Sequence, residues 1–156
     1  MINPSELRIG NIILFKGEPI KVVGIRLGSV MLDGVMYETN NPQHSYEYHQ
    51  IPVSEDVLSP LYLSDALLER IRSRVYRSEG NVYPLRNNMN FLIMKGADGF
   101  FVGMDRTDGP MHLTPHSFTA FHQLQNIYYS MYGEELPIEI GKIKQELSLL
   151  KELGRI

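Results

Sequence analysis

Two histidines, His112 and His116, stand four residues apart, the spacing at which one face of a helix presents two metal ligands. Further potential ligands lie nearby in the sequence: Asp105, Asp108 and His122. However, Thr114-Pro115 predicts that a helix begins between the two histidines, and no glutamate separates them as the metalloprotease motif requires. We therefore interpret both as solvated turn residues. A metal-dependent enzyme that uses them with an aspartate is the distant alternative.

Arginine and tyrosine side chains are concentrated between residues 70 and 86, where Glu79 is the single acid. The candidate contact residues are Arg70, Arg72, Arg74, Arg77, Arg86, Tyr76 and Tyr83. Arginines interleaved with aromatic rings are typical of surfaces that follow phosphates and stack on bases. The other interpretation is a solvated face whose arginines pair with acids elsewhere in a chain of formal net charge −3. Both interpretations remain open.

Other catalytic patterns are missing from the sequence. The chain has no cysteine, which excludes thiol catalysis and cysteine-based zinc sites. The loop 96–99 lacks the lysine of a nucleotide-binding loop, and no serine stands in a Gly-x-Ser-x-Gly elbow. We therefore expect no enzyme activity, no catalytic or metal-ligating residue and no cofactor.

The composition is that of an ordinary globular protein, with 43% hydrophobic and 21% charged residues in a chain of 156. No stretch approaches the roughly 18 apolar residues of a membrane span, and residues 1–8 carry no signal-peptide pattern. The absence of cysteine suits a reducing compartment. We expect a cytoplasmic protein that has no contact with membranes.

Residues 7–51 predict five short β-strands separated by tight turns. The strand segments are 12–15, 20–25, 29–32, 35–38 and 46–51. Asp33-Gly34 is a strong two-residue hairpin signal, so the third and fourth strands should pair with each other. Five such strands predict a small antiparallel barrel of SH3-like size over residues 1–58.

Residues 59–136 predict a meander sheet with two helices. The first helix is expected over 64–74 with Ser64 as its N-cap, and the second over 115–132 with Gly133 at its end. The strands between them are 75–77, 82–83, 90–94, 100–103 and 111–113. Their connections are too short for parallel crossovers. The fold class is therefore α+β: a small N-terminal SH3-like antiparallel barrel followed by an antiparallel meander sheet packed with helices.

Residues 137–156 predict a terminal helix. Its apolar positions step by four and three residues and are Leu136, Ile140, Ile143, Leu147 and Leu150. This is coiled-coil spacing, but it spans only two heptads. A helix this short is unstable alone. It therefore either docks on the protein's own body or forms a homodimer through 138–153, and the sequence leaves both open.

Three segments carry a resemblance to a known family. They are Leu7-Arg8-Ile9-Gly10-Asn11, the segment 59–64, and His122-Gln123-Leu124-Gln125-Asn126-Ile127-Tyr128-Tyr129 with Gly133-Glu134-Glu135-Leu136. Over about residues 5–136 the chain resembles a family of small proteins found in gut-bacterial genomes and their phages or prophages. The resemblance implies a genomic setting, but it brings no established activity.

The recurring residues of these segments have a structural interpretation. Gly10 precedes a strand, where a positive φ or a tight turn favours glycine. Gln125 projects into the apolar arc of the main helix, so its amide must find partners, which we expect among backbone groups of the neighbouring sheet. We interpret the set as a motif that fixes the helix on the sheet, with a ligand-contacting edge as the alternative. The motif comprises Gly10, Asn11, His122, Gln125 and Asn126.

These observations favour a non-catalytic interaction or accessory protein of phage or mobile-element type, whose protein partner is unknown. A nucleic-acid-binding module that uses the arginine and tyrosine stretch 70–86 is the alternative function.

Overall fold

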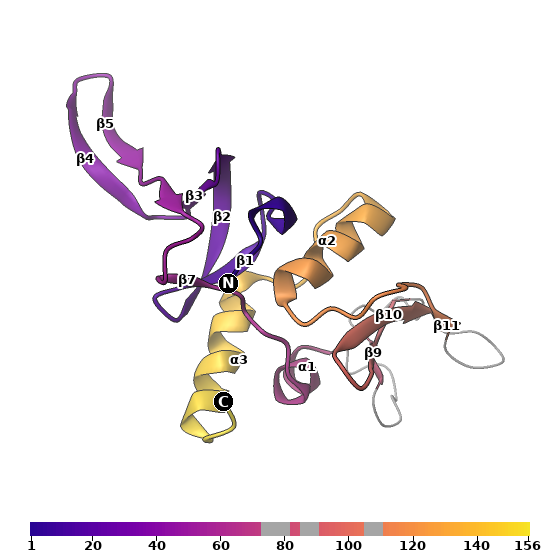
Figure 1. Cartoon of the computed structure of the whole chain (residues 1–156). Coiled ribbons are helices and arrows are strands. Elements are labelled where there is room, and N and C mark those ends of the chain that lie inside the picture. The colour runs from indigo at the N-terminus through magenta and orange to yellow at the C-terminus, as the bar shows by residue number, and fades with distance from the viewer. Residues whose placement is uncertain (73–81, 85–90, 105–110) are drawn as a thin grey trace.

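The computed structural model describes residues 1–72, 82–84, 91–104 and 111–156. In these ranges the chain is an α+β protein with three α-helices and three antiparallel sheets (Figure 1). A membrane-spanning helix is absent from the described ranges, because none of their helices reaches the length and hydropathy that a bilayer crossing requires.

A curled antiparallel half-barrel forms the N-terminal part. It has five strands in the order β6-β3-β2-β1-β7. Their bounds are β1 (Ile12–Phe15), β2 (Glu18–Arg26), β3 (Ser29–Leu32), β6 (Ile51–Pro52) and β7 (Leu58–Ser59), and a short 3-10 helix, η1 (Pro4–Glu6), precedes them. A register shift between Val22 and Gly24 in β2 lies in the pairing with β3. Such bulges increase the twist of a sheet and help it to curl.

The fourth predicted strand and most of the fifth, 46–51, do not join this half-barrel. They form β4 (Met36–Asn41) and β5 (His44–Tyr48), a separate two-stranded sheet that projects from the body (Figure 1). Only Ile51, at the end of the fifth predicted strand, lies in β6 of the half-barrel. The prediction that β3 pairs with the next strand was wrong, although Asp33-Gly34 does form a turn. β6 lies beside β3 instead, because Ile51 opposite Val30 gives that edge a side chain that can be buried in the core.

The second sheet is an antiparallel meander in the order β11-β10-β9-β8, as predicted. Its strands are β8 (Val82–Pro84), β9 (Leu92–Lys95), β10 (Phe100–Met104) and β11 (Met111–His112). The backbone N–H of Gly96 donates to the carbonyl of Gly99 at 2.8 Å, which closes the turn between β9 and β10. The strand predicted at 75–77 lies outside the described residues.

The first helix, α1 (Asp65–Ile71), begins at the predicted N-cap. The Ser64 hydroxyl accepts a hydrogen bond from the Leu67 backbone N–H at 3.1 Å. The helix ends before Arg72, whose backbone is extended, and residues 73–74 of the predicted helix lie outside the described part.

The main helix, α2 (Phe121–Tyr132), begins six residues later than predicted. Thr114-Pro115 does not start it: the chain bends at Pro115 and His116 without forming a helix, and Phe118 then bridges to Phe100 of β10. The backbone N–H of each of these phenylalanines donates to the carbonyl of the other at 2.8 Å. These two hydrogen bonds hold Phe118 against β10, so the helix begins after this residue and not at Thr114-Pro115.

Side chains and glycine define the ends of α2. The Gln123 Oε1 accepts from the backbone N–H groups of Thr119 and Ala120, both at 3.1 Å, and so ties the entering chain to the first turn. The helix ends at Gly133, as predicted, with a left-handed φ of 66°.

The terminal helix, α3 (Ile140–Glu152), docks on the chain's own body. Its apolar residues Ile143, Leu147 and Leu150 are buried in the larger core cluster. Glu146 of the same helix is also buried, and its Oε2 accepts a hydrogen bond from the Arg70 Nε of α1 at 2.5 Å. The apolar seam of the terminal helix is therefore covered within a single chain.

Two buried clusters make up the core, and β1 separates them. Ile12 belongs to the cluster that the helices share with β9 and β10, whereas Ile13 belongs to the interior of the half-barrel. Successive residues of a strand point to opposite faces, so one strand serves both clusters. Whatever fixes α2 to β1 therefore holds the two halves of the protein together.

Candidate functional site

Gln125 joins α2 to the beginning of β1. Its Oε1 accepts from the Ile12 backbone N–H at 2.8 Å, and its Nε2 donates to the Gly10 carbonyl at 3.1 Å. The side chain is 4% exposed. Both polar atoms of the amide thus have backbone partners on the strand.

Asn126 makes the neighbouring contact between the same two segments. Its Oδ1 accepts from the Asn11 Nδ2 at 2.9 Å and from the Arg8 Nε at 3.2 Å. Its Nδ2 donates to the Glu6 carbonyl at 2.5 Å. Asn11 is fully buried, and its Oδ1 accepts from the Arg8 backbone N–H at 2.7 Å. The side-chain amides thus satisfy polar groups of the turn before β1.

Arg8 extends this network to the end of α2 and the residues that follow it. Its guanidinium lies 4.2 Å from the centroid of the Tyr129 ring and pairs with the Glu135 carboxylate, with Nη2 3.0 Å from Oε2. This pairing lowers the pKa of Glu135, chiefly through the hydrogen bond from Arg8. The segments 7–11, 122–129 and 133–136, which carry the family resemblance, therefore meet at one place.

Gly10 has a backbone conformation that favours glycine. Its φ is +94°, a left-handed value that other residues rarely adopt. A Cβ there would lie 2.9 Å from the Glu135 Oε1, at the end of a flexible side chain that can move aside. The backbone conformation therefore accounts for this part of the motif.

His122 is the exception in this network. It is 2% exposed, neither ring nitrogen has a hydrogen-bond partner among the described residues, and its Nε2 lies 3.5 Å from the Glu6 Oε2. Burial lowers its pKa, and Glu6 opposes that shift in part. The two side chains line a hollow of about 170 Å³. One imidazole and one carboxylate are too few ligands for a structural metal site.

A larger cleft of about 530 Å³ lies between the β1–β2 edge and the start of α3. Its ionisable residues are Lys21, Glu135 and Glu139, and Gln125 also lines it, whereas His122 lies at the other hollow. Because the Gln125 amide is engaged by backbone, it contributes little to this cleft. The arrangement contains no recognisable catalytic pair.

The other sequence candidates are not brought together by the described structure. Arg70 pairs with Glu146, and Arg72 donates from Nε to Glu69 at 3.0 Å. The remaining members of the arginine and tyrosine stretch lie outside the described residues or, for Tyr83, in a strand whose side chain is not described: Arg74, Arg77, Arg86, Tyr76 and Tyr83.

The structure describes only part of the histidine pair and its neighbours. His116 is exposed in a turn, and the backbone of His112 lies in β11, but its side chain is outside the described part, as are Asp105 and Asp108. Among the residues that the structure places, no three histidine or acidic side chains gather as metal ligands would.

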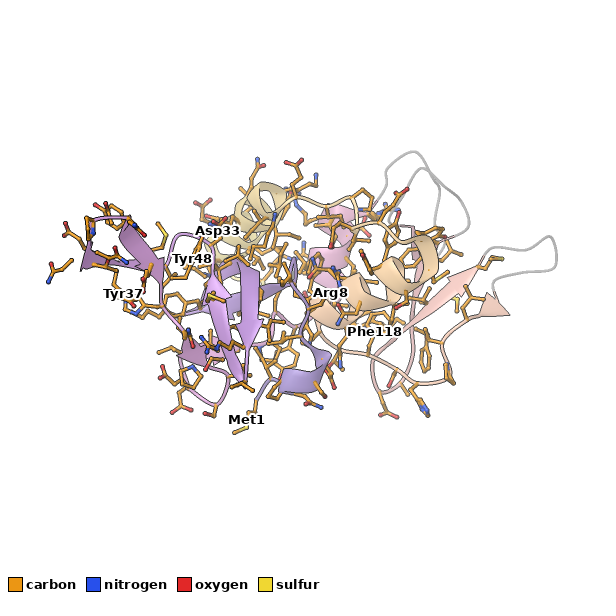
Figure 2. All side chains as sticks on the ribbon, turned by 90° about the horizontal axis from the view of Figure 1, so that it is seen from above. Met1, Arg8, Asp33, Tyr37, Tyr48 and Phe118 are labelled. Atoms are coloured by element: carbon orange, nitrogen blue, oxygen red, sulfur yellow. The ribbon has the colours of Figure 1, made fainter. Side chains whose placement is uncertain are left out.

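The β4–β5 hairpin is the feature that sequence reasoning missed. Tyr37 and Tyr48 lie on it, and Figure 2 shows this hairpin at one end of the molecule. Between residues 36 and 50 no described side chain is buried. The alternation of Tyr46, Glu47 and Tyr48 predicts a strand with two unlike faces. The alternation does not show that both faces of the hairpin are left uncovered by the rest of the described chain.

The register of the hairpin sorts its side chains onto two faces. Met36 lies opposite Tyr48, and Glu38 opposite Tyr46, so these four share one face. Met36 is 44% exposed, Tyr46 61% and Tyr48 40%. We call this set of four residues the tyrosine face.

The opposite face of the hairpin holds contacts within the chain. The Tyr37 hydroxyl donates to the Glu47 Oε2 at 2.8 Å, which raises the pKa of the tyrosine. The Tyr37 ring lies 4.8 Å from the ring of His49, centroid to centroid.

Comparison with known proteins gives no family. No family model, curated protein or solved structure matches this chain. The geometry of the chain itself must therefore carry any assignment. Among the described residues, Met36, Tyr46 and Tyr48 are exposed together on one face of the hairpin, and no three histidine or acidic side chains are grouped as metal ligands.

Proposed function

We propose that the chain is a non-catalytic interaction protein and that the tyrosine face of the β4–β5 hairpin contacts a protein partner. In this proposal it is an accessory protein of phage or mobile-element type, as the family resemblance implies. The observation that carries the proposal is the exposure of Met36, Tyr46 and Tyr48 on one face of a projecting hairpin.

The composition of this face supports a protein partner. Tyrosine and methionine are enriched in the cores of protein interfaces, where they bury large areas at modest cost in conformational entropy. A two-stranded hairpin without a covered face is marginally stable in water. A partner that covers the tyrosine face would therefore stabilise the hairpin as well as bind it.

The rest of the protein provides a support for the hairpin. Its strands leave from Val35 and return at His49, where the His49 backbone N–H donates to the Val35 carbonyl at 3.0 Å. The half-barrel below is anchored to α2 through Gln125 and Asn126. We interpret the half-barrel as SH3-like, a scaffold that commonly presents binding surfaces, although the fold alone assigns no partner.

Site-specific photo-crosslinking tests this proposal. A benzophenone side chain replaces Tyr46 and, as a matched control, Tyr62, an equally exposed tyrosine on the body of the protein (61% and 59%). In cells that naturally make the protein, we expect a discrete protein adduct from position 46 that disappears when Tyr48→Ala is added. Equal adduct patterns from both positions, or none from position 46, would contradict the proposal.

A further inference from the structure

The tyrosine face holds a carboxylate among its apolar side chains. Glu38 lies directly opposite Tyr46 and two residues from Met36 on the same strand, so it shares the face with them. An aromatic face that served only to bury apolar area would not need a charge there. The position of this carboxylate therefore bears on the charge that the partner carries at this surface.

The charge of the whole hairpin has one sign. Residues 36–49 contain Glu38 and Glu47 but no lysine or arginine. Interfaces pair surfaces of opposite potential, and a polyanion such as nucleic acid would be repelled. The hairpin is therefore suited to a positively charged partner.

We propose that the tyrosine face binds a basic segment of a partner protein, with an arginine of that segment against Tyr46 and Glu38. This inference rests on the proposed function, because it specifies the chemistry of the same surface. A guanidinium stacks on a tyrosine ring by cation–π attraction while it donates to a carboxylate in a planar, bidentate manner. A lysine ammonium can make the cation–π contact but not the planar, bidentate hydrogen bonds to the carboxylate.

The protein already contains such an arrangement internally. The Arg8 guanidinium lies 4.2 Å from the Tyr129 ring centroid and pairs with the Glu135 carboxylate. There, one arginine lies over a tyrosine ring and pairs with a glutamate carboxylate at the same time. On the hairpin, the tyrosine and the glutamate are supplied by this chain and the arginine is supplied by the partner.

A second copy of the chain is a weaker occupant. In a symmetric dimer the same face meets itself, so the two Glu38 carboxylates would be brought into one apolar interface. Like charges in such a position are destabilising. We therefore assign the face to a partner of opposite charge.

Peptide binding to the full chain tests the charge of the partner. The probes are fluorescent ten-residue peptides that alternate valine with arginine, lysine, citrulline or glutamate, measured by fluorescence anisotropy. Citrulline keeps the shape of arginine but removes its charge. We expect the arginine peptide to bind about tenfold more tightly than the citrulline peptide, and the binding to weaken as salt is raised.

Two glutamate variants provide a matched pair. Glu38→Gln should weaken binding of the arginine peptide by several-fold, whereas Glu47→Gln, on the other face and bonded to Tyr37, should change it little. Tyr46→Ala should abolish the preference for arginine over citrulline. Equal effects of the two glutamate variants would overturn the assignment to the tyrosine face.

The remaining outcomes separate this inference from the proposed function. If the citrulline or glutamate peptide binds as well as the arginine peptide, or if none binds, the basic partner is wrong, while an adduct at position 46 still supports a protein partner. Binding of a single-stranded oligonucleotide that Tyr46→Ala abolishes, or a dimer in light scattering that Tyr46→Ala dissociates, would overturn the inference in favour of those occupants.

Discussion

The side-chain amides of Asn11 and Asn126 bond to each other at 2.9 Å across 115 positions of the sequence. The contact joins the turn before β1 to the second turn of α2. Gln125 adds two backbone bonds beside it. Since β1 contributes to both core clusters, this set of amides fixes the main helix relative to both halves of the protein.

Replacement of Gln125 by alanine should strongly destabilise the fold. The Ile12 N–H would lose its partner in a buried place and the Gly10 carbonyl in a half-buried one, and an unsatisfied buried group costs about 1–3 kcal/mol. We expect Gln125→Ala to lower the free energy of unfolding by about 3 kcal/mol in urea titrations. Gln145→Ala, on the exposed side of α3, serves as the control and should change it by less than about 0.5 kcal/mol.

Gly10→Ala should destabilise the protein mainly through its backbone. The left-handed φ disfavours any side chain, whereas the new methyl would meet only the end of the flexible Glu135 side chain, which can move aside. We expect a loss of about 1 kcal/mol in thermal or chemical unfolding. In a double-mutant cycle, Glu135→Ala should therefore recover little of this loss. Full recovery would show that φ does not matter here.

The Arg70–Glu146 pair should matter more than an ordinary surface ion pair. Glu146 is 6% exposed, so removal of Arg70 leaves a nearly buried carboxylate without its cation. We expect Arg70→Ala to cost about 2 kcal/mol and the added Glu146→Gln to restore part of it. Lys151→Ala, which breaks an exposed pair with Glu18, should cost less than about 0.5 kcal/mol. Equal losses would contradict this assignment.

Local signals predicted the elements whose cause is local. Ser64 caps α1, Gly133 ends α2, and the short connections make the second sheet antiparallel, all as the sequence indicates. Each depends on a few neighbouring residues. The partners of Gln125 were likewise expected among backbone groups, because a buried amide must be satisfied.

Elements whose cause is tertiary were not predicted. Thr114-Pro115 is a good helix start in isolation, yet Phe118 bridges to Phe100 and the helix begins only at Phe121. The strand pattern around Tyr46 is real, but only Ile51, at the end of the predicted segment, lies beside β3. A sequence pattern shows that the two faces of a strand or helix differ in polarity, but it does not show which element of the fold packs against them.

The buried His122 should make the protein less stable in mild acid. Burial lowers its pKa below the ordinary 6.5, so the unfolded chain takes up a proton at a higher pH than the folded chain does. Stability is therefore complete above about pH 6.5 and falls as the pH drops from there towards the folded pKa. We expect urea titrations between pH 5 and 8 to show this slope, and His122→Gln to flatten it. His116→Gln, at an exposed turn, should leave the slope unchanged.

Removal of the β4–β5 hairpin should leave the rest of the fold intact. Val35 and His49 are already joined by a backbone hydrogen bond of 3.0 Å, so an Asn-Gly turn can replace residues 36–48 without moving them. No described side chain in that segment is buried, and the half-barrel and helices therefore lose no core contact. We expect the free energy of unfolding to change by less than about 1 kcal/mol and the circular dichroism of the helices to persist. A cooperative loss of the whole structure would instead show that the hairpin supports the half-barrel, and the tyrosine face would then have a structural role within the chain.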